Sequence, residues 1–293
     1  MNNFDFEIQN LIEIHSEFHF LEKVDHLSRV FLGRVYLNGA LGEGEEGEFD
    51  QNPLYRLDAF DCVTYINTVL ALSSASNLIE FQQAMKKINY YHGDTRYEKR
   101  FHFMCIDWNR ENQNRGLLKD ITFDVVDKKG NPIALLASTI IDRPNWFFLR
   151  QRSDIKLKKA SELEIQNKLN QLRSLSNQFK AEKSELFYLP LDQLFDAQLQ
   201  PKLDIFAQMS HGSLIEIVRP NWNLFKKIGT HLNISHVGFL YLKEQELYFR
   251  HASQVGQVCE EPLIAYLKKY LNNPTVKGIN IQKINCQHSF VIN

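Results

Sequence analysis

The strongest constraint on the fold is a change of hydrophobic pattern along the 293-residue chain. Between residues 6 and 38, apolar residues such as Leu11, Ile14 and Phe18 recur at helical spacing. In the last third, apolar residues alternate with polar ones, as in HVGFLYL (236–242) and ELYFRHA (246–252). A chain with its helices first and its strands last favours an α+β fold built on an antiparallel sheet.

The same patterns predict the remaining elements. We expect a loop at GEGEEGEFDQNP (42–53), a helix from residue 57 to 72 and a second one from 78 to 91. ITFDVVD (121–127) and IALLASTII (133–141) are predicted as two strands around a KKGNP turn. Further strands are expected at GSLIEIVRP, ending at Pro220, and at KGINIQKI, with a helix at 263–271 between them and a KEQE turn joining the two alternating runs.

A charged amphipathic stretch at about 153–185 is predicted as a helical insertion. It is either a solvated helix or a helix that binds a partner. Its apolar seam consists of Leu163, Ile165, Leu169, Leu172 and Leu175. We expect one catalytic domain over residues 1–293, with this insertion and an N-terminal helical part at about 1–40.

Composition excludes several classes of function. Hydrophobic residues make up 44% of the chain, which is enough for a sizeable core. The formal net charge of −1 gives no bulk attraction for nucleic acid. No run of eighteen apolar residues exists, so we expect no membrane insertion. The acidic start MNNFDFEIQN lacks the parts of a secretory signal. We expect either a cytoplasmic protein or a periplasmic or exported one whose signal was removed.

The four cysteines are widely spaced and form no CxxC pair, which argues against a zinc knuckle. Free, mostly buried thiols are the expectation for Cys62, Cys105, Cys259 and Cys286. His15 and His19 share a helix face at i, i+4, but no HExxH motif accompanies them. We therefore predict no metal site and no cofactor. The oligomeric state is not encoded in any pattern that we recognise.

Cys62 stands out among these thiols because it lies in LDAFDCVTYINTVLAL (57–72), where a loop becomes an apolar helix. Asp58 or Asp61 is placed to cap the first turn. The free N–H groups and the dipole of a helix N-terminus favour a thiolate there. The alternative is a cysteine that only packs in the core.

A nucleophilic thiol needs a base from elsewhere in the chain. His236 begins one strand of the predicted hairpin and His251 nearly ends the other. The short turn brings these strand ends together, so the two imidazoles are expected side by side. One ring can then accept the proton of Cys62 while the other orients it. Two unrelated histidines at strand ends are the alternative.

DAFDCVTY, GSLIEIV, SHVGFLYL and RHAS, in this order, resemble the NlpC-type cell-wall cysteine peptidases. This resemblance implies a papain-like core in which a nucleophile helix packs on an antiparallel sheet, with helical additions. It places the nucleophile at Cys62, the base at His236 and the second histidine at His251.

A closer resemblance is to the N-acetylmuramoyl-L-alanine amidase-like branch of that group. It is carried by the runs at 41–66, 100–112 and 236–253 and covers most of the chain outside the 153–185 helix. Many NlpC-type enzymes read Asp-Cys-Ser-Gly, whereas this chain reads Asp61-Cys62-Val63-Thr64. The loss of Ser-Gly shifts the expected target from peptides with a free N-terminal L-alanine to the muramoyl–L-alanine amide bond.

The resemblance implies a cysteine amidase that hydrolyses an amide bond in peptidoglycan-derived muropeptides. The alternatives are a γ-D-glutamyl–diaminopimelate endopeptidase, a non-catalytic module that binds cell-wall peptide, and an acyltransferase. Expected oxyanion and substrate contacts come from Tyr55 on the approach loop, from Asp61, and from one polar-aromatic stretch. That stretch supplies Arg100, His102, Trp108 and Asn109.

Overall fold

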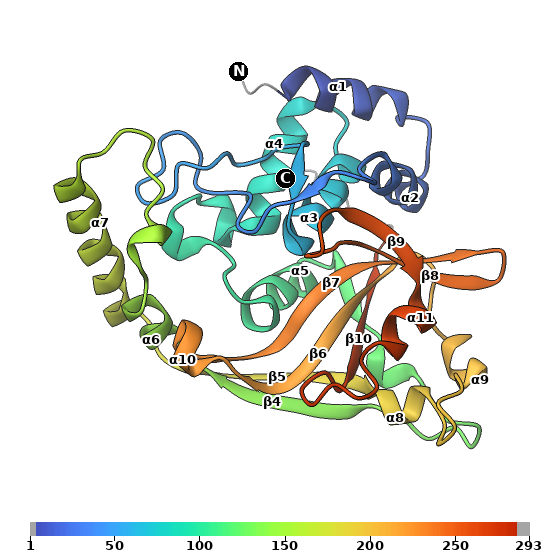
Figure 1. Cartoon of the computed structure of the whole chain (residues 1–293). Coiled ribbons are helices and arrows are strands. Elements are labelled where there is room, and N and C mark those ends of the chain that lie inside the picture. The colour runs from blue at the N-terminus through green and yellow to red at the C-terminus, as the bar shows by residue number, and fades with distance from the viewer. Residues whose placement is uncertain (1–3, 286–293) are drawn as a thin grey trace.

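The computed structural model describes residues 4–285, so Cys286 lies outside the described residues. Four helices near the N-terminus cover one face of a strongly curved antiparallel sheet (Figure 1). They are α1 (Asp5–Ile14), α2 (Phe20–Val30), α3 (Cys62–Ser74) and α4 (Leu78–Asn89). The predicted α+β class with an antiparallel sheet is confirmed.

The sheet has the strand order β4-β5-β10-β6-β7-β8-β9, and β3 pairs with β10 beside this path. All its pairings are antiparallel. A separate parallel pair consists of β1 (Val35–Tyr36) and β2 (Ala59–Phe60), and it leads directly into α3. The strands of the large sheet are β3 (Leu118–Asp120), β4 (Leu135–Ile141), β5 (Glu182–Pro190), β6 (Ser213–Asn223), β7 (His231–Lys243), β8 (Glu246–Ala252), β9 (Val258–Pro262) and β10 (Gly278–Ile284).

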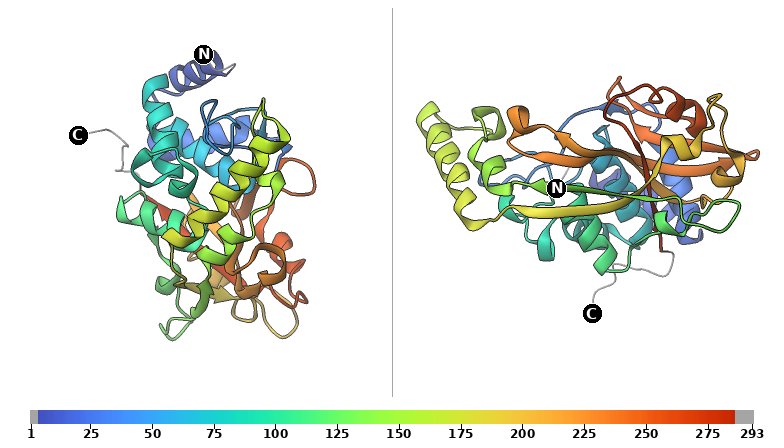
Figure 2. Two further views of the ribbon diagram at one scale, coloured as in Figure 1. Left: turned by 90° about the vertical axis from the view of Figure 1, so that its left-hand side faces the viewer. Right: turned by 90° about the horizontal axis from the view of Figure 1, so that it is seen from below.

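Smaller helices cover the other parts of the sheet. From below, the α6 and α7 region lies at one end of the long strands, and the segments of α8, α9 and α11 lie towards the other end (Figure 2). These elements are α5 (Arg110–Asn114), α6 (Arg143–Phe148), α7 (Glu162–Ser174), α8 (Leu191–Leu194), α9 (Leu203–Phe206), α10 (Phe225–Ile228) and α11 (Leu263–Lys268). A π-helical turn, η3 (Met104–Asn109), precedes α5. Short 3₁₀ turns occur at η1 (Tyr91–Gly93), η2 (Tyr97–Lys99), η4 (Thr122–Asp124), η5 (Arg152–Asp154) and η6 (Leu175–Gln178).

The two faces of β7 bury different residues because side chains alternate along a strand. Val237 and Phe239 enter the core beneath α3, where Tyr65 meets Phe239 in an edge-to-face contact with ring centroids 5.7 Å apart. Leu240 enters a second core with residues of β6, β10 and α11. The strand that carries His236 is therefore fixed by packing on both faces.

The predicted hairpin is confirmed. Strands β7 and β8 are joined by Glu244 and Gln245, whose φ angles are 47° and 69°. Two consecutive residues with positive φ are typical of the two-residue turns whose twist matches that of the strands.

Four predicted elements differ in detail from the structure. The region expected to be helical over residues 6–38 consists of two helices, α1 and α2, and ends in the short strand β1. The ring of His15 lies 2.7 Å from the Leu11 carbonyl oxygen at the end of α1, and His19 caps α2 together with Glu22. These two histidines therefore cap helices, because their side chains form hydrogen bonds with backbone groups that the helices leave without a partner.

ITFDVVD is a turn and not a strand. The Thr122 N–H donates to the side chain of Asp120 at 2.9 Å, which bends the chain into η4.

Strand β6 runs past Pro220, where register shifts against β7 accommodate a residue without an N–H donor.

The stretch at 153–185 contains the predicted helix only over Glu162–Ser174, and β5 begins at Glu182. Within its seam, Leu169 and Leu172 are buried, whereas Leu163 is 71% exposed. Across residues 4–285, no helix has both the length and the apolar character needed to cross a bilayer.

Candidate active site

Cys62 is the first residue of α3, and its position is fixed by a capping box. The Asp61 carboxylate accepts a hydrogen bond from the Thr64 N–H at 2.8 Å, while the Thr64 hydroxyl accepts one from the Asp61 N–H at 2.9 Å. The second oxygen of Asp61 accepts from the Gly39 N–H at 3.2 Å. Asp61 thus holds the helix start and the preceding loop together.

The sulfur of Cys62 faces the backbone N–H of Val237, the residue after His236, and this N–H acts to lower the pKa of the thiol. Burial raises the pKa of the Cys62 thiol to about 12, and the charge of Asp61 acts in the same direction. Burial and the charge of Asp61 raise the pKa of the thiol more than the free N–H groups at the helix N-terminus lower it. The thiol of Cys62 is therefore protonated at neutral pH. Attack on a carbonyl then requires a base next to the sulfur.

His236 and His251 lie side by side, as the hairpin predicted. Nε2 of His236 is 2.7 Å from Nδ1 of His251, and the rings meet nearly at right angles. Burial and the charge of His251 lower the pKa of His236 to about 3. Burial, followed by the charge of Lys269, lowers that of His251 to about 4. Two neutral rings that share one hydrogen bond have coupled tautomers, because only one of the facing nitrogens carries a proton.

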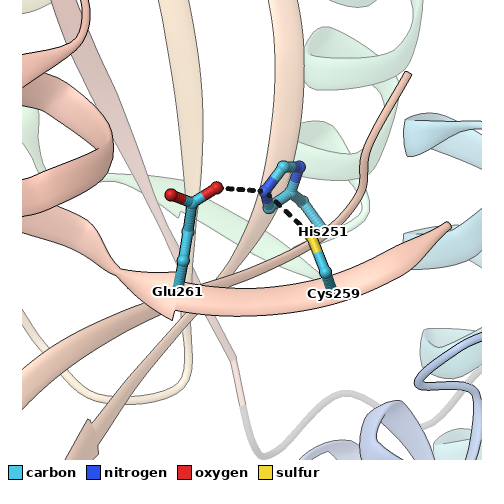
Figure 3. A group of neighbouring side chains, drawn as sticks. All are labelled: His251, Cys259 and Glu261. Carbon is cyan, nitrogen blue, oxygen red and sulfur yellow. Dashed lines mark hydrogen bonds and ion pairs between the residues drawn. The ribbon is translucent and has the colours of Figure 1, made fainter. Parts of the chain in front are cut away.

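The other ring nitrogen of His251 faces β9, where Cys259 and Glu261 both point at it (Figure 3). Nε2 lies 3.6 Å from the Cys259 sulfur and 3.5 Å from an oxygen of Glu261. Sequence reasoning missed these two contacts because it placed no strand at Val258–Pro262. The signal that could have found them is the spacing Cys-x-Glu, which puts both side chains on one face of a strand.

A cavity of about 200 Å³ opens beside the two histidines. Arg219, Trp222 and Tyr266 line it. The guanidinium of Arg219 lies over the Trp222 ring at 4.6 Å, and its buried Nε has no hydrogen-bond partner among residues 4–285. Sequence analysis missed Arg219 and Trp222, although IVRPNWN places a cation and an aromatic ring on one strand near His236.

Tyr36 lies close to Cys62 and was not singled out from the sequence. Burial raises its pKa, and the charges of Cys62 and Asp61 raise it further. The pairing of Tyr36 with Phe60 in the β1–β2 ladder places it next to the helix start.

Tyr55, by contrast, is held by α1 and α4. Its hydroxyl donates to Asp5 at 2.7 Å and accepts from Gln82 at 2.7 Å. Arg100 is also engaged by the protein itself, because its guanidinium donates to the Leu41 carbonyl at 2.7 Å and faces Asp50.

The remaining predicted contacts are buried structural groups. Trp108 is 1% exposed, and its indole N–H donates to Asn67 at 2.8 Å. Asn109 donates to the buried carboxyl of Glu216 at 2.9 Å. The ring of His102 packs on Trp146 and lies 2.8 Å from the Tyr97 carbonyl oxygen. The structure therefore places Cys62 and Asp61 at the start of α3 beside the segment of β7 that follows His236, and pairs His236 with His251. The side chains expected from the 100–109 stretch are instead engaged by other parts of the protein.

Comparison with solved structures identifies similar folds. A crystal structure of a protein from Legionella pneumophila str. Philadelphia 1 is 41% identical, with a TM-score of 0.93 over 96% of this chain and 94% of that one. Two crystal structures of an N-acetylmuramoyl-L-alanine amidase from Bacteroides uniformis are 19% and 20% identical, with TM-scores of 0.61 and 0.60. Each covers 91% of this chain and 99% of the other. None of the curated proteins matches the chain in sequence.

The family model described as N-acetylmuramoyl-L-alanine amidase-like matches residues 26–276. This match includes Cys62, both site histidines and the strand that carries Glu261. The chain therefore belongs to the N-acetylmuramoyl-L-alanine amidase-like family.

Proposed function

We propose that the protein is a cysteine-dependent amidase of NlpC-type, papain-like architecture that hydrolyses an amide bond in peptidoglycan fragments. Its preferred target in this proposal is the bond between N-acetylmuramic acid and L-alanine. The observation that carries the proposal is the meeting of two distant segments. The sulfur at the start of α3 faces the Val237 N–H, and the preceding residue, His236, shares a hydrogen bond with His251.

The hydrogen bonds support a role for each group. Because Nε2 of His236 faces His251, its Nδ1 is the nitrogen that takes the Cys62 proton. The thiolate attacks the carbonyl carbon, and the developing oxyanion is bound by the Tyr36 hydroxyl and the Cys62 N–H. His236 then protonates the leaving amine of L-alanine, which leaves a thioester on Cys62. A water molecule, deprotonated by His236, hydrolyses this thioester and frees the sugar carboxylate.

The cavity next to the histidines offers suitable substrate contacts. In the proposal, the Trp222 ring packs against the sugar and the guanidinium of Arg219 binds a carboxylate of the peptide. The unpaired Nε of Arg219 supports this role, since a buried donor gains most from a charged acceptor. Asp61 acts as a positioning residue that fixes the start of α3.

Digestion of a defined disaccharide-tetrapeptide, with the products weighed by mass spectrometry, tests the proposal. Release of the free disaccharide and the intact tetrapeptide supports it. Products cut after D-glutamate indicate the γ-D-glutamyl–diaminopimelate endopeptidase instead, and transfer to an added amine indicates an acyltransferase.

Replacing Cys62 by Ala should lower the rate by at least about 10⁴-fold, because the nucleophile is lost. The matched control is Cys105→Ala, another partly buried thiol that should retain activity. Hydrolysis that survives Cys62→Ala contradicts the assignment of the nucleophile. Binding of the disaccharide-tetrapeptide without turnover by the unaltered protein indicates a non-catalytic module.

A further inference from the structure

We propose that His251, Cys259 and Glu261 form a zinc-binding site, and that zinc bound there inhibits the enzyme through the paired histidines. The inhibitory part rests on the proposed function, whereas the binding part does not. The three side chains come from two neighbouring strands, and all of them face one point (Figure 3).

Strand register fixes the three ligands. His251 lies opposite Cys259 in the β8–β9 ladder, and Glu261 follows Cys259 by two residues on the same face. The three candidate ligand atoms lie within 4.8 Å of one another. Since neighbouring strands hold the Cα positions, little backbone rearrangement is needed to bring these atoms around an ion.

Two of the three spacings between the ligand atoms match tetrahedral zinc. With bonds of about 2.3 Å to sulfur and about 2.0–2.1 Å to nitrogen and oxygen, tetrahedral ligand atoms lie roughly 3.4–3.6 Å apart. Nε2 of His251 is 3.6 Å from the Cys259 sulfur and 3.5 Å from the nearer Glu261 oxygen. Two of the three ligand pairs already have the separation that the ion requires.

The donor set also selects the ion. A thiolate with an imidazole favours zinc over magnesium or calcium, which prefer shells of oxygen ligands. The thiolate and the carboxylate together balance the double positive charge. Lys269 binds the other oxygen of Glu261 and leaves the oxygen nearer the ring available. Cys259 and Glu261 are both partly exposed, so an ion can reach them from solvent, and a water molecule can fill the fourth position.

Zinc binding would reverse the tautomers of both histidines. Coordination breaks the S–H bond of Cys259, releases that proton to solvent and occupies Nε2 of His251. The ring proton of His251 must then lie on Nδ1, where it is donated to Nε2 of His236. The proton of His236 consequently lies on its Nδ1, the nitrogen that has to accept the proton of Cys62. Without the ion, Glu261 can accept a hydrogen bond from Nε2–H of His251. Nδ1 of His251 then accepts from Nε2–H of His236, and Nδ1 of His236 carries no proton and can accept that of Cys62.

Cobalt binding tests the site without any need for hydrolysis. The Cys62→Ala protein titrated with Co²⁺ should take up one equivalent and show a thiolate-to-cobalt charge-transfer absorption. Adding Cys259→Ser should remove this absorption, whereas adding Cys105→Ser should leave it. An absorption that persists in the Cys259→Ser protein, or is missing from Cys62→Ala alone, overturns the site.

Inhibition is measured on proteins with Cys62 intact, and each variant is compared with its own rate in chelator. Zinc should inhibit the unaltered protein and Cys105→Ser equally, and EDTA should restore both. Cys259→Ser should raise the zinc concentration needed for half-inhibition by at least about 100-fold, because a direct ligand is lost. An unchanged half-inhibition concentration overturns the inhibitory role. If cobalt binds but no protein hydrolyses the disaccharide-tetrapeptide, the proposed function fails and the metal site stands.

Discussion

At the scale of single residues, two tyrosines show what sequence distance conceals. Tyr55 precedes Cys62 by a few residues, yet its hydroxyl is bonded to Asp5 and Gln82. Tyr36 lies farther away along the chain, but the parallel β1–β2 pair brings it to the start of α3. The sequence could not show that Tyr36, and not Tyr55, lies near Cys62, because the position of Tyr36 depends on a long-range pairing of two-residue strands.

Replacing Tyr36 by Phe should therefore lower kcat by about 10²–10³-fold, since the proposed oxyanion donor is removed. Tyr55→Phe is the matched control and should leave kcat unchanged. It should instead lower the free energy of unfolding by about 1.5–3 kcal/mol, because a hydrogen bond to a carboxylate is lost. Steady-state kinetics and urea denaturation of both variants check this, and a lower kcat for Tyr55→Phe alone would reverse the assignment.

Glu216 gives a prediction about pH. Its side chain is fully buried beside Asn109, and burial raises its pKa to about 8. A carboxyl with a raised pKa in the folded protein stabilises the fold at low pH, and this contribution is lost as the pH rises from about 4.5 through 8.

Glu216→Gln cannot ionise. Its stability relative to the unaltered protein should increase by about 1 kcal/mol per pH unit across that window. Urea denaturation at pH 5 and pH 8 measures the difference, and equal differences at both pH values would contradict it.

At the scale of elements, local signals were sufficient where neighbouring residues determine the structure. The Asp61 cap, the apolar helix after it and the β7–β8 hairpin follow from residues close together in the sequence. The ITFDVVD segment has the composition of a strand, but the Asp120 side chain turns it, and a composition rule does not include that bond. Trp222 was missed because β6 was expected to end at Pro220, whereas the strand continues to Asn223.

The histidine pair also depends on a glycine of β7. A Cβ at Gly238 would lie 2.7 Å from the Arg250 carbonyl oxygen and 2.7 Å from Cβ of His251. Gly238→Ala should push β8 away and separate the two rings, which lowers the free energy of unfolding by about 1–3 kcal/mol and kcat by about 10²-fold. Gly130→Ala is the control, because its turn has no atom within 4 Å of the new Cβ. It should cost stability through its positive φ and leave kcat intact, and an unchanged kcat in Gly238→Ala would refute the argument.

At the scale of the whole molecule, one buried cation connects the N-terminal helices to the sheet. Arg250 of β8 is 0% exposed and lies 3.0 Å from Asp25 of α2 and 2.5 Å from Glu260 of β9. The ring of Tyr241 lies 4.1 Å from its guanidinium. Helix α2 and strands β8 and β9 thus meet at the charge of Arg250, the residue directly before His251.

Arg250→Met should lower the free energy of unfolding by about 3–5 kcal/mol, because it leaves two carboxylates without their buried partner. Arg29→Met removes the exposed partner of the same Asp25 and should cost less than about 1 kcal/mol. Denaturant unfolding of the two variants makes the comparison. Equal losses would show that Arg250 is no stronger a link than a surface ion pair.

In the proposed mechanism the nucleophile, Cys62, begins α3, whereas both imidazoles belong to β7 and β8, which follow much later in the sequence. During synthesis the sulfur therefore leaves the ribosome long before its proposed base. A chain that still lacks β7 and β8 carries the thiol without this histidine pair, so the proposed catalysis can begin only after both strands have been made and have folded.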